Sequence, residues 1–224
     1  MAKTTISTTT DFLQAYNLNS KTMKTISLVL ALVLTTNAFA GDPVKLREAF
    51  QKSYASEAKG DYAGAIKALK EVYDETSYET NLRLGWLLYS AGSLVDAQGY
   101  YQKAINLMPA GIEARLGMVY PLAALGQWDK VAKQYEELLK IDAKHSKTLY
   151  NLGMILYGKE QYDKALAQFN IGLNLYPFDY DFNLMTAWAS YRVGKMREAK
   201  ILFEKVLLIS PEDTSAKEGL GLVK

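Results

Sequence analysis

The stretch SKTLYNLGMILYGKEQYDKALAQFNIGLNLYPFD, residues 146–179, contains two apolar patterns that are separated by a short polar turn. Leu149, Leu152 and Leu156 recur at spacings of three and four before the turn, and residues 165–173 repeat this pattern after it. Apolar residues at this spacing line one face of an α-helix. The stretch therefore predicts two amphipathic helices that fold back on each other as a hairpin.

The pattern recurs without insertion, so that four segments of 34 residues follow one another: 78–111, 112–145, 146–179 and 180–213. Glycine occupies the turn column of every segment except one, where Glu160 replaces it. Glycine there permits the left-handed backbone that ends a helix. Three other columns also recur. One holds small or short residues: Ala97, Val131, Ala165 and Ala199. One holds aromatic residues, Tyr101, Tyr135, Phe169 and Phe203, and one near the segment end holds proline or alanine, Pro109, Ala143, Pro177 and Pro211. An incomplete copy, two residues short, covers residues 46–77.

This period, with these residues in these columns, resembles the tetratricopeptide repeat (TPR) family from about residue 43 to the C-terminus. The resemblance implies an all-α fold, a right-handed α-solenoid of about five antiparallel helix hairpins. Physical reasoning leads to the same fold, because a single hairpin cannot bury its apolar face and a stack of hairpins can. Residues 214–224 are expected to form a short C-terminal helix that caps the last hairpin.

Residues 23–40 resemble a secretory signal peptide. Lys24 supplies a positive start, residues 26–34 form an apolar run, and residues 38–40 read Ala-Phe-Ala, a small-x-small cleavage pattern. The apolar run is about half as long as a membrane-spanning helix requires. We therefore expect an exported protein, periplasmic or secreted if bacterial. The alternative is a chain anchored in the membrane by an uncleaved signal.

Residues 1–22 precede this signal and are polar, rich in threonine and serine, and without an apolar period. Signal peptides normally begin near their positive region. We therefore interpret residues 1–22 as a disordered extension, or as a misassigned gene start with translation beginning at Met23. The solenoid domain is expected to span residues 41–224.

The composition excludes several kinds of site. The chain has no cysteine, so disulfides and thiolate metal sites are impossible. Its one histidine, His145, has no second histidine or cysteine to join it and is expected to be a solvated loop residue. No phosphate-binding loop or nucleophile elbow occurs. We predict no catalytic, cofactor-binding or metal-binding residues, and no enzyme.

The net charge of +2 arises within the first forty residues, because 23 basic and 23 acidic residues follow them. A neutral domain lacks the basic excess that drives nucleic-acid binding. We therefore expect no nucleic-acid partner, and no stable membrane insertion once the signal is removed.

The candidate partner-binding surface lies on the first helix of each hairpin. The resemblance implies that these helices line the concave side, where partners dock. The fifth, ninth and twelfth places of each segment share one helical face. They give a groove set of Phe50, Tyr54, Leu82, Trp86, Tyr89, Leu116, Tyr120, Tyr150, Met154, Tyr157, Leu184, Trp188 and Tyr191, with Arg83, Lys147 and Arg192 at its rim for acidic groups.

Aromatic residues at these places have two explanations, a binding groove or plain packing between helices. The ninth column favours a groove, because the family usually has a small or polar residue there. This chain instead has Tyr54, Trp86, Tyr120, Met154 and Trp188 in that column. Tryptophan and tyrosine are the side chains most often found as interface hot spots.

We therefore predict a non-catalytic scaffold or adaptor of the cell envelope or secreted space. It would bind an apolar or aromatic segment of another protein in the groove. The alternatives are a homo-oligomeric structural protein, or an accessory subunit of an envelope enzyme or of a polysaccharide or secretion machine. A glycan is a less favoured ligand. Pro121 lies inside the first helix of residues 112–145 and is either a tolerated kink or a widening of the groove.

Overall fold

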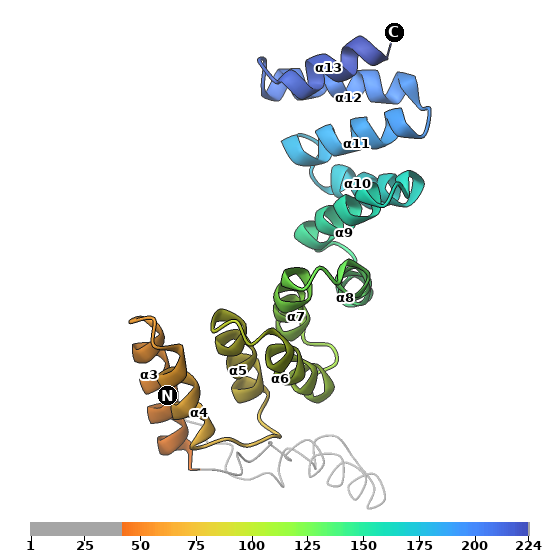
Figure 1. Ribbon diagram of the computed structural model, residues 1–224. Coiled ribbons are helices and arrows are strands. Elements are labelled where there is room, and N and C mark those ends of the chain that lie inside the picture. The colour runs from red at the N-terminus through yellow and green to blue at the C-terminus, as the bar shows by residue number, and fades with distance from the viewer. Residues whose placement is uncertain (1–41, 224) are drawn as a thin grey trace, which may run out of the picture. The chain divides into compact units, whose positions relative to one another are not determined.

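The computed structural model describes residues 42–223, which contain eleven α-helices and no strand (Figure 1). They form five hairpins and a final helix: α3 (Pro43–Glu57) with α4 (Tyr62–Lys70), α5 (Tyr78–Ser90) with α6 (Leu94–Leu107), α7 (Ile112–Ala124) with α8 (Trp128–Ile141), α9 (Ser146–Gly158) with α10 (Tyr162–Leu175), α11 (Tyr180–Arg192) with α12 (Met196–Ile209), and α13 (Thr214–Leu222). The predicted α-solenoid is confirmed. The predictions for residues 1–22 and for the signal at 23–40 lie outside the described residues.

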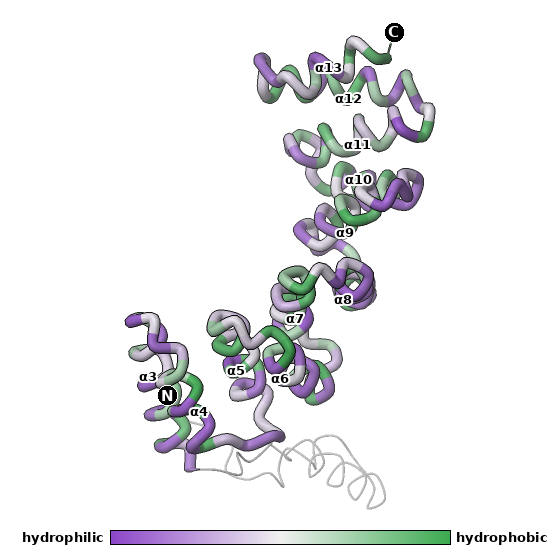
Figure 2. The backbone as a smooth tube through the Cα atoms, in the orientation of Figure 1, coloured by the Kyte–Doolittle hydropathy of each residue, from purple (hydrophilic) through white to green (hydrophobic). Residues whose placement is uncertain are grey.

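The helices follow the 34-residue period of the sequence. The helices α5, α7, α9, α11 and α13 begin at Tyr78, Ile112, Ser146, Tyr180 and Thr214. From α4 onward, each helix contacts the next in the chain, and α5 also contacts α7, as α9 contacts α11 and α11 contacts α13. Figure 2 shows hydrophobic and hydrophilic residues interspersed along the helices, as in helices that bury part of their surface.

Side-chain caps fix where several helices begin. Ser77, Asp179 and Asp213 each accept a hydrogen bond from a backbone N–H three residues later, at the start of α5, α11 and α13. His145 does the same for α9, where its Nδ1 lies 3.2 Å from the backbone nitrogen of Thr148. His145 lies in the loop before α9, as expected, but the expectation that it is solvated is wrong, because its ring is half-buried and caps the helix.

The turns inside the hairpins have the predicted left-handed backbone. Gly60, Gly92, Gly126 and Gly194 have φ between 66° and 82°, and Glu160 has φ 60° in the equivalent turn. A side chain disfavours this conformation, so the turn at Glu160 is strained, whereas the equivalent turns with glycine are not.

The aromatic column forms the spine of the core. Tyr101, Phe169 and Phe203 are buried, and glycines lie against their rings. A Cβ atom added at Gly117 would lie 2.2 Å from Cε1 of Tyr101, and one added at Gly153 would lie 2.3 Å from Cε1 of Phe169. Contacts this short are impossible, so Gly117 and Gly153 must remain without a side chain for these rings to keep their positions.

Pro121 does not end its helix. The α7 helix continues to Ala124, and the backbone N–H of Leu125 donates to the Pro121 carbonyl at 3.2 Å. The proline ring is buried and is not part of the groove lining described below. Its missing N–H leaves the carbonyl of Gly117 without the usual helical donor.

Candidate partner-binding groove

The helices α3, α5 and α7 line a groove of about 680 Å³. The groove contains the predicted residues of the first three hairpins at the fifth and ninth places: Phe50, Tyr54, Leu82, Trp86, Leu116 and Tyr120. Equivalent faces of successive helices therefore join into one surface, as the spacing predicts.

Aromatic rings in this groove remain open to solvent. Tyr54, Trp86 and Tyr120 are 55%, 39% and 45% exposed. The ring centroids of Trp86 and Tyr120 are 6.1 Å apart, and Tyr89 lies 5.8 Å from Trp86 and 5.5 Å from Tyr120. We refer to Trp86, Tyr89 and Tyr120 as the aromatic cluster. It offers a partner a large apolar contact area with few side-chain rotations to freeze.

Arg83 does not lie at a solvent-exposed rim, and that prediction is wrong. Its side chain is 9% exposed, and its guanidinium lies 3.9 Å from the ring centroid of Tyr54 and 2.5 Å from a carboxylate oxygen of Glu57. The other oxygen of Glu57 accepts a hydrogen bond from Trp86 Nε1 at 2.6 Å. Tyr54 and Glu57 on α3 thus contact Arg83 and Trp86 on α5. The charge of Arg83 is already paired within the chain.

The same network sets the charge state of Glu57. Burial raises the pKa of its carboxyl, but the hydrogen bonds from Arg83 and Trp86 outweigh burial and bring the pKa below its ordinary value. Glu57 is therefore ionised at neutral pH and neutralises Arg83. The pair fixes the Trp86 indole in position without adding net charge to the groove.

Two carboxylates line the opposite end of the groove. Glu79 and Glu113 are the second residues of α5 and α7, and both are exposed. The Tyr78 hydroxyl donates to Glu113 at 3.3 Å, and burial together with the Glu113 charge raises the pKa of that phenol. Sequence reasoning missed these acids. Their position three residues before Leu82 and Leu116 places them on the same helical face and could have revealed them.

The predicted residues of the last two hairpins are not part of this groove. Tyr150 packs between Phe169 and Phe182 at centroid distances of 6.1 and 5.9 Å, and Tyr157 packs edge-on against Tyr162 at 5.1 Å. Tyr191 and Leu184 are half-buried beside the C-terminal core. Of the predicted groove residues in these two hairpins, Met154 is the one that is exposed, at 39%.

Trp188 is held by the C-terminal cap. Its ring lies edge-on to Phe203 at a centroid distance of 5.0 Å, and its Nε1 donates to Ser215 Oγ on α13 at 2.9 Å. A half-buried indole in such contacts serves packing. Plain packing is therefore the better explanation for this member of the ninth column, and a groove is the better one for Trp86.

The two remaining rim residues lie in the second half of the chain. Lys147 is exposed at the start of α9, and Arg192 is exposed at the end of α11. The Arg192 guanidinium lies 4.1 Å from the ring centroid of Tyr162, so its charge already faces an aromatic ring. Neither residue lines the groove of α3, α5 and α7.

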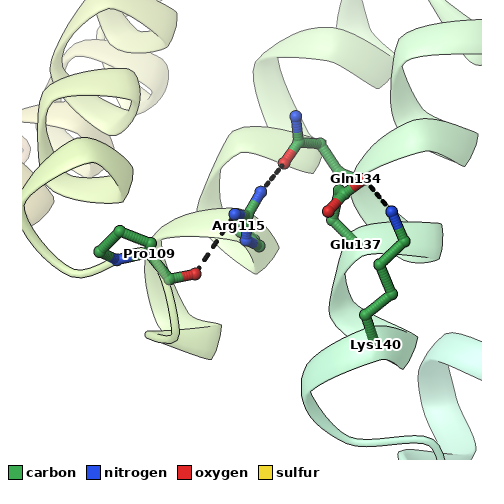
Figure 3. Close-up of polar contacts among 5 residues, drawn as sticks. All are labelled: Pro109, Arg115, Gln134, Glu137 and Lys140. Atoms are coloured by element: carbon green, nitrogen blue, oxygen red, sulfur yellow. Dashed lines mark hydrogen bonds and ion pairs between the residues drawn. The ribbon is translucent and has the colours of Figure 1, made fainter.

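A second hollow, of about 1010 Å³, lies among α6, α7 and α8. Figure 3 shows how Arg115 bridges its walls, with hydrogen bonds to the Pro109 carbonyl at 3.2 Å and to Gln134 at 3.4 Å, beside the Lys140–Glu137 ion pair. Eight of its thirteen lining residues are polar or charged, and none is aromatic. Arg115 joins consecutive hairpins there, so we assign this hollow a structural role.

Two further observations concern metal binding and membrane spans. Residues 42–223 contain no group of three or more histidine, aspartate or glutamate side chains arranged to hold a metal ion. None of the helices within that range has both the length and the apolar character needed to cross a membrane.

Comparison with known proteins agrees with the geometry. A sequence model of the tetratricopeptide repeat matches residues 50–112 and 122–180, more than half of the chain. The chain belongs to the tetratricopeptide repeat family. Its hairpins, left-handed turns and small-residue columns are those expected of this family's helical stack.

Curated relatives of this TPR chain are distant. It is 24% identical over 158 residues to the TPR repeat-containing protein YpiA of Bacillus subtilis, covering 69% of the chain and 37% of YpiA. It is 26% identical to the human protein O-mannosyl-transferase TMTC1, and the match covers 62% of the chain and 20% of TMTC1. It is 24% identical to bovine BBSome complex member BBS4, and the match covers 70% of the chain and 31% of BBS4. The chain thus spans only a fifth to somewhat over a third of these relatives.

Solved structures share the fold. A tetratricopeptide repeat protein from Parabacteroides merdae superposes with a TM-score of 0.66 at 23% identity, covering 80% of this chain and 72% of that one. MamA superposes with a TM-score of 0.64 at 21% identity, covering 75% of this chain and 93% of MamA. YrrB, described as a TPR protein with an unusual peptide-binding site, superposes with a TM-score of 0.61 at 22% identity. The match covers 70% of this chain and 80% of YrrB.

Proposed function

We propose that this TPR protein is a non-catalytic adaptor that binds an apolar or aromatic segment of another protein in the groove of α3, α5 and α7. TPR proteins serve generally as interaction scaffolds, and this chain offers one suitable surface. The observation that carries the proposal is the exposure of Tyr54, Trp86 and Tyr120 within a groove of about 680 Å³. Exposed rings gathered in a hollow are typical of protein-binding sites.

We further propose that the adaptor acts in the cell envelope or outside the cell. The signal-like pattern of residues 23–40 supports this location. N-terminal sequencing of the protein purified from its own cells tests it. A start at Gly41 is expected, and a start at Met1 in a cytoplasmic fraction would contradict export.

The groove is tested by replacing Trp86 and Tyr120 together with alanine. Both rings are partly exposed, so helicity measured by circular dichroism is expected to be retained. Truncating an interface hot spot costs about 2 kcal/mol or more, which is roughly a 30-fold loss of affinity for each ring. The double variant should therefore lose the proteins that the unaltered chain captures from its own compartment, measured by quantitative mass spectrometry.

A matched control is available outside the groove. Trp128→Ala combined with Phe178→Ala removes two aromatic rings that are 51% and 62% exposed. This control should capture the same proteins as the unaltered chain. Equal capture by the Trp86→Ala/Tyr120→Ala variant would remove the groove as the binding site.

Self-association is the second candidate function. Ile201 and Leu208, seven residues apart on α12, are 54% and 74% exposed. Residues seven apart lie on one helical face and could pack against a second copy. Light scattering distinguishes the two functions, because a stable dimer that becomes monomeric with Leu208→Lys would favour self-assembly.

A further inference from the structure

The groove of α3, α5 and α7 has two chemically different ends. Trp86 and Tyr120, the two members of the aromatic cluster that line the groove, form one end and stand at the ninth places of their segments. Glu79 and Glu113, at the second places, form the other. Leu82 and Leu116 lie between them on the same helices, so the groove changes from aromatic through aliphatic to acidic.

The acidic end has an uncompensated charge. Among the residues that the structure describes, Arg83 is the one cation that lines the groove, and Glu57 neutralises it at 2.5 Å. Glu79 and Glu113 form no ion pair with any residue between positions 42 and 223; their hydrogen-bond donors are the uncharged hydroxyls of Ser77 and Tyr78. An exposed carboxylate pair beside an apolar floor favours a cation.

The column that supplies this acidic end changes charge in the next segment. Lys147 occupies the same column at the start of α9, where the two preceding segments have glutamate. A basic residue of a partner would be attracted by Glu79 and Glu113 and repelled by Lys147. The charge pattern therefore selects the groove of α3, α5 and α7 over the next hairpin.

The length of the groove limits the spacing of the ligand. Glu79 and Trp86 are seven residues apart on α5, which at 1.5 Å per residue is about 10 Å along the helix axis. An extended peptide advances about 3.3 Å per residue, so about three residues span this distance. Glu113 and Tyr120 on α7 repeat the same separation.

We propose that the groove binds an extended protein segment that carries a lysine or arginine about three residues from a large aromatic or aliphatic residue. The basic residue pairs with Glu79 and Glu113, and the apolar residue packs on Trp86 and Tyr120. This inference rests on the proposed adaptor function and specifies the partner's chemistry. It reverses the expectation from sequence that the groove rim attracts acidic groups.

The test uses the full chain and a random dodecapeptide library displayed on phage. Peptides enriched on the unaltered chain should combine a basic residue with an aromatic or aliphatic residue about three positions away. The best peptide, labelled with fluorescein, should bind at least 10-fold more weakly to the Glu79→Gln/Glu113→Gln variant. Its affinity for the unaltered chain should fall as salt is raised from about 50 to 500 mM, since exposed charges are screened.

Two controls separate binding from folding. First-turn glutamates also favour helix formation, so circular dichroism and urea unfolding must show that Glu79→Gln/Glu113→Gln remains folded. Glu136→Gln/Glu198→Gln removes two exposed carboxylates outside the groove and should leave peptide affinity unchanged.

The outcomes are distinct. Enrichment of acidic peptides, or equal affinity for the unaltered chain and the Glu79→Gln/Glu113→Gln variant, would overturn this inference. If such a peptide still required Trp86 and Tyr120, the proposed function would stand. Absence of any peptide whose binding depends on Trp86 and Tyr120 would overturn both.

Discussion

The contact between Gly172 and Phe182 allows a quantitative test of how neighbouring hairpins fit together. Gly172 on α10 and Phe182 on α11 occupy columns that hold Val206 and Ala216 one repeat later. A Cβ atom added at Gly172 would lie 1.9 Å from Cε1 of Phe182. The large and small residues are thus exchanged between the two junctions. We predict that Gly172→Val and Phe182→Ala are each damaging alone and compensate when combined.

The expected magnitudes follow from the packing. Phe182 is 5% exposed and contacts Tyr150 and Tyr176, so Phe182→Ala should cost about 3–5 kcal/mol. Gly172→Val forces a side chain into the ring and should cost about 3 kcal/mol, at the upper end for overpacking. In the double variant the valine fills the space that the ring leaves. The remaining loss, from the two ring contacts, should be about 1–3 kcal/mol.

The assay is urea unfolding of the unaltered chain, both single variants and the double variant, followed by circular dichroism. Stacked repeats can unfold in parts, so midpoints should be compared only where the slopes agree. The coupling free energy, which is the sum of the two single losses minus the loss in the double variant, should be at least about 3 kcal/mol, at the upper end of the range seen for contacting residues. A double variant whose loss equals the sum of the single losses would refute this account of the junction.

Three further predictions concern single positions. Glu160→Gly should stabilise the chain by about 1 kcal/mol, because φ 60° disfavours a side chain, and this should raise the melting temperature by roughly 2–4 °C. Gly194→Ala, at φ 82°, should lower the melting temperature by a similar amount. His145→Ala should cost about 1 kcal/mol in urea unfolding through loss of the α9 cap, and His145→Asn should recover most of it. The folded-state pKa of Glu57 is lowered, so its contribution to stability is complete above the ordinary carboxyl pKa and is lost as pH falls through the folded value. Glu57→Gln should therefore flatten the decline of the urea midpoint between about pH 6 and pH 3, and a parallel decline in both proteins would count against the Glu57–Arg83–Trp86 network.

The period of the sequence was sufficient to predict the fold. Helix starts at Tyr78, Ile112, Ser146 and Tyr180 coincide with the starts of the 34-residue segments. Each segment carries its own turn residue, its own small columns and its own aromatic residue, so local and tertiary preferences agree in every copy. These features can be recognised within a single segment, without knowing which distant residues the segment contacts.

The site was less predictable, because its residues depend on contacts between helices. Arg83 looks like a free cation in the sequence, and its partner Glu57 lies 26 residues earlier on another helix. Trp86 and Trp188 are equivalent in the repeat, yet Ser215 and Phe203 hold Trp188 in the C-terminal core. Glu79 and Glu113 resemble ordinary first-turn acids, which many helices have. Only the arrangement of α5 beside α7 brings them to one groove.

Exchanges of large and small residues also explain why the groove residues of the two halves of the chain differ in exposure. In the first half the fifth column holds Leu82 and Leu116, which leave the neighbouring ninth-column rings exposed. In the second half Phe182 takes a column that is small in the other junctions, and Tyr150 turns onto it instead of lining a groove. Aromatic area that stabilises the later junctions is therefore not available to a partner. The exposed rings of the earlier hairpins have no such neighbour, and a docking segment would supply the apolar contact that they lack.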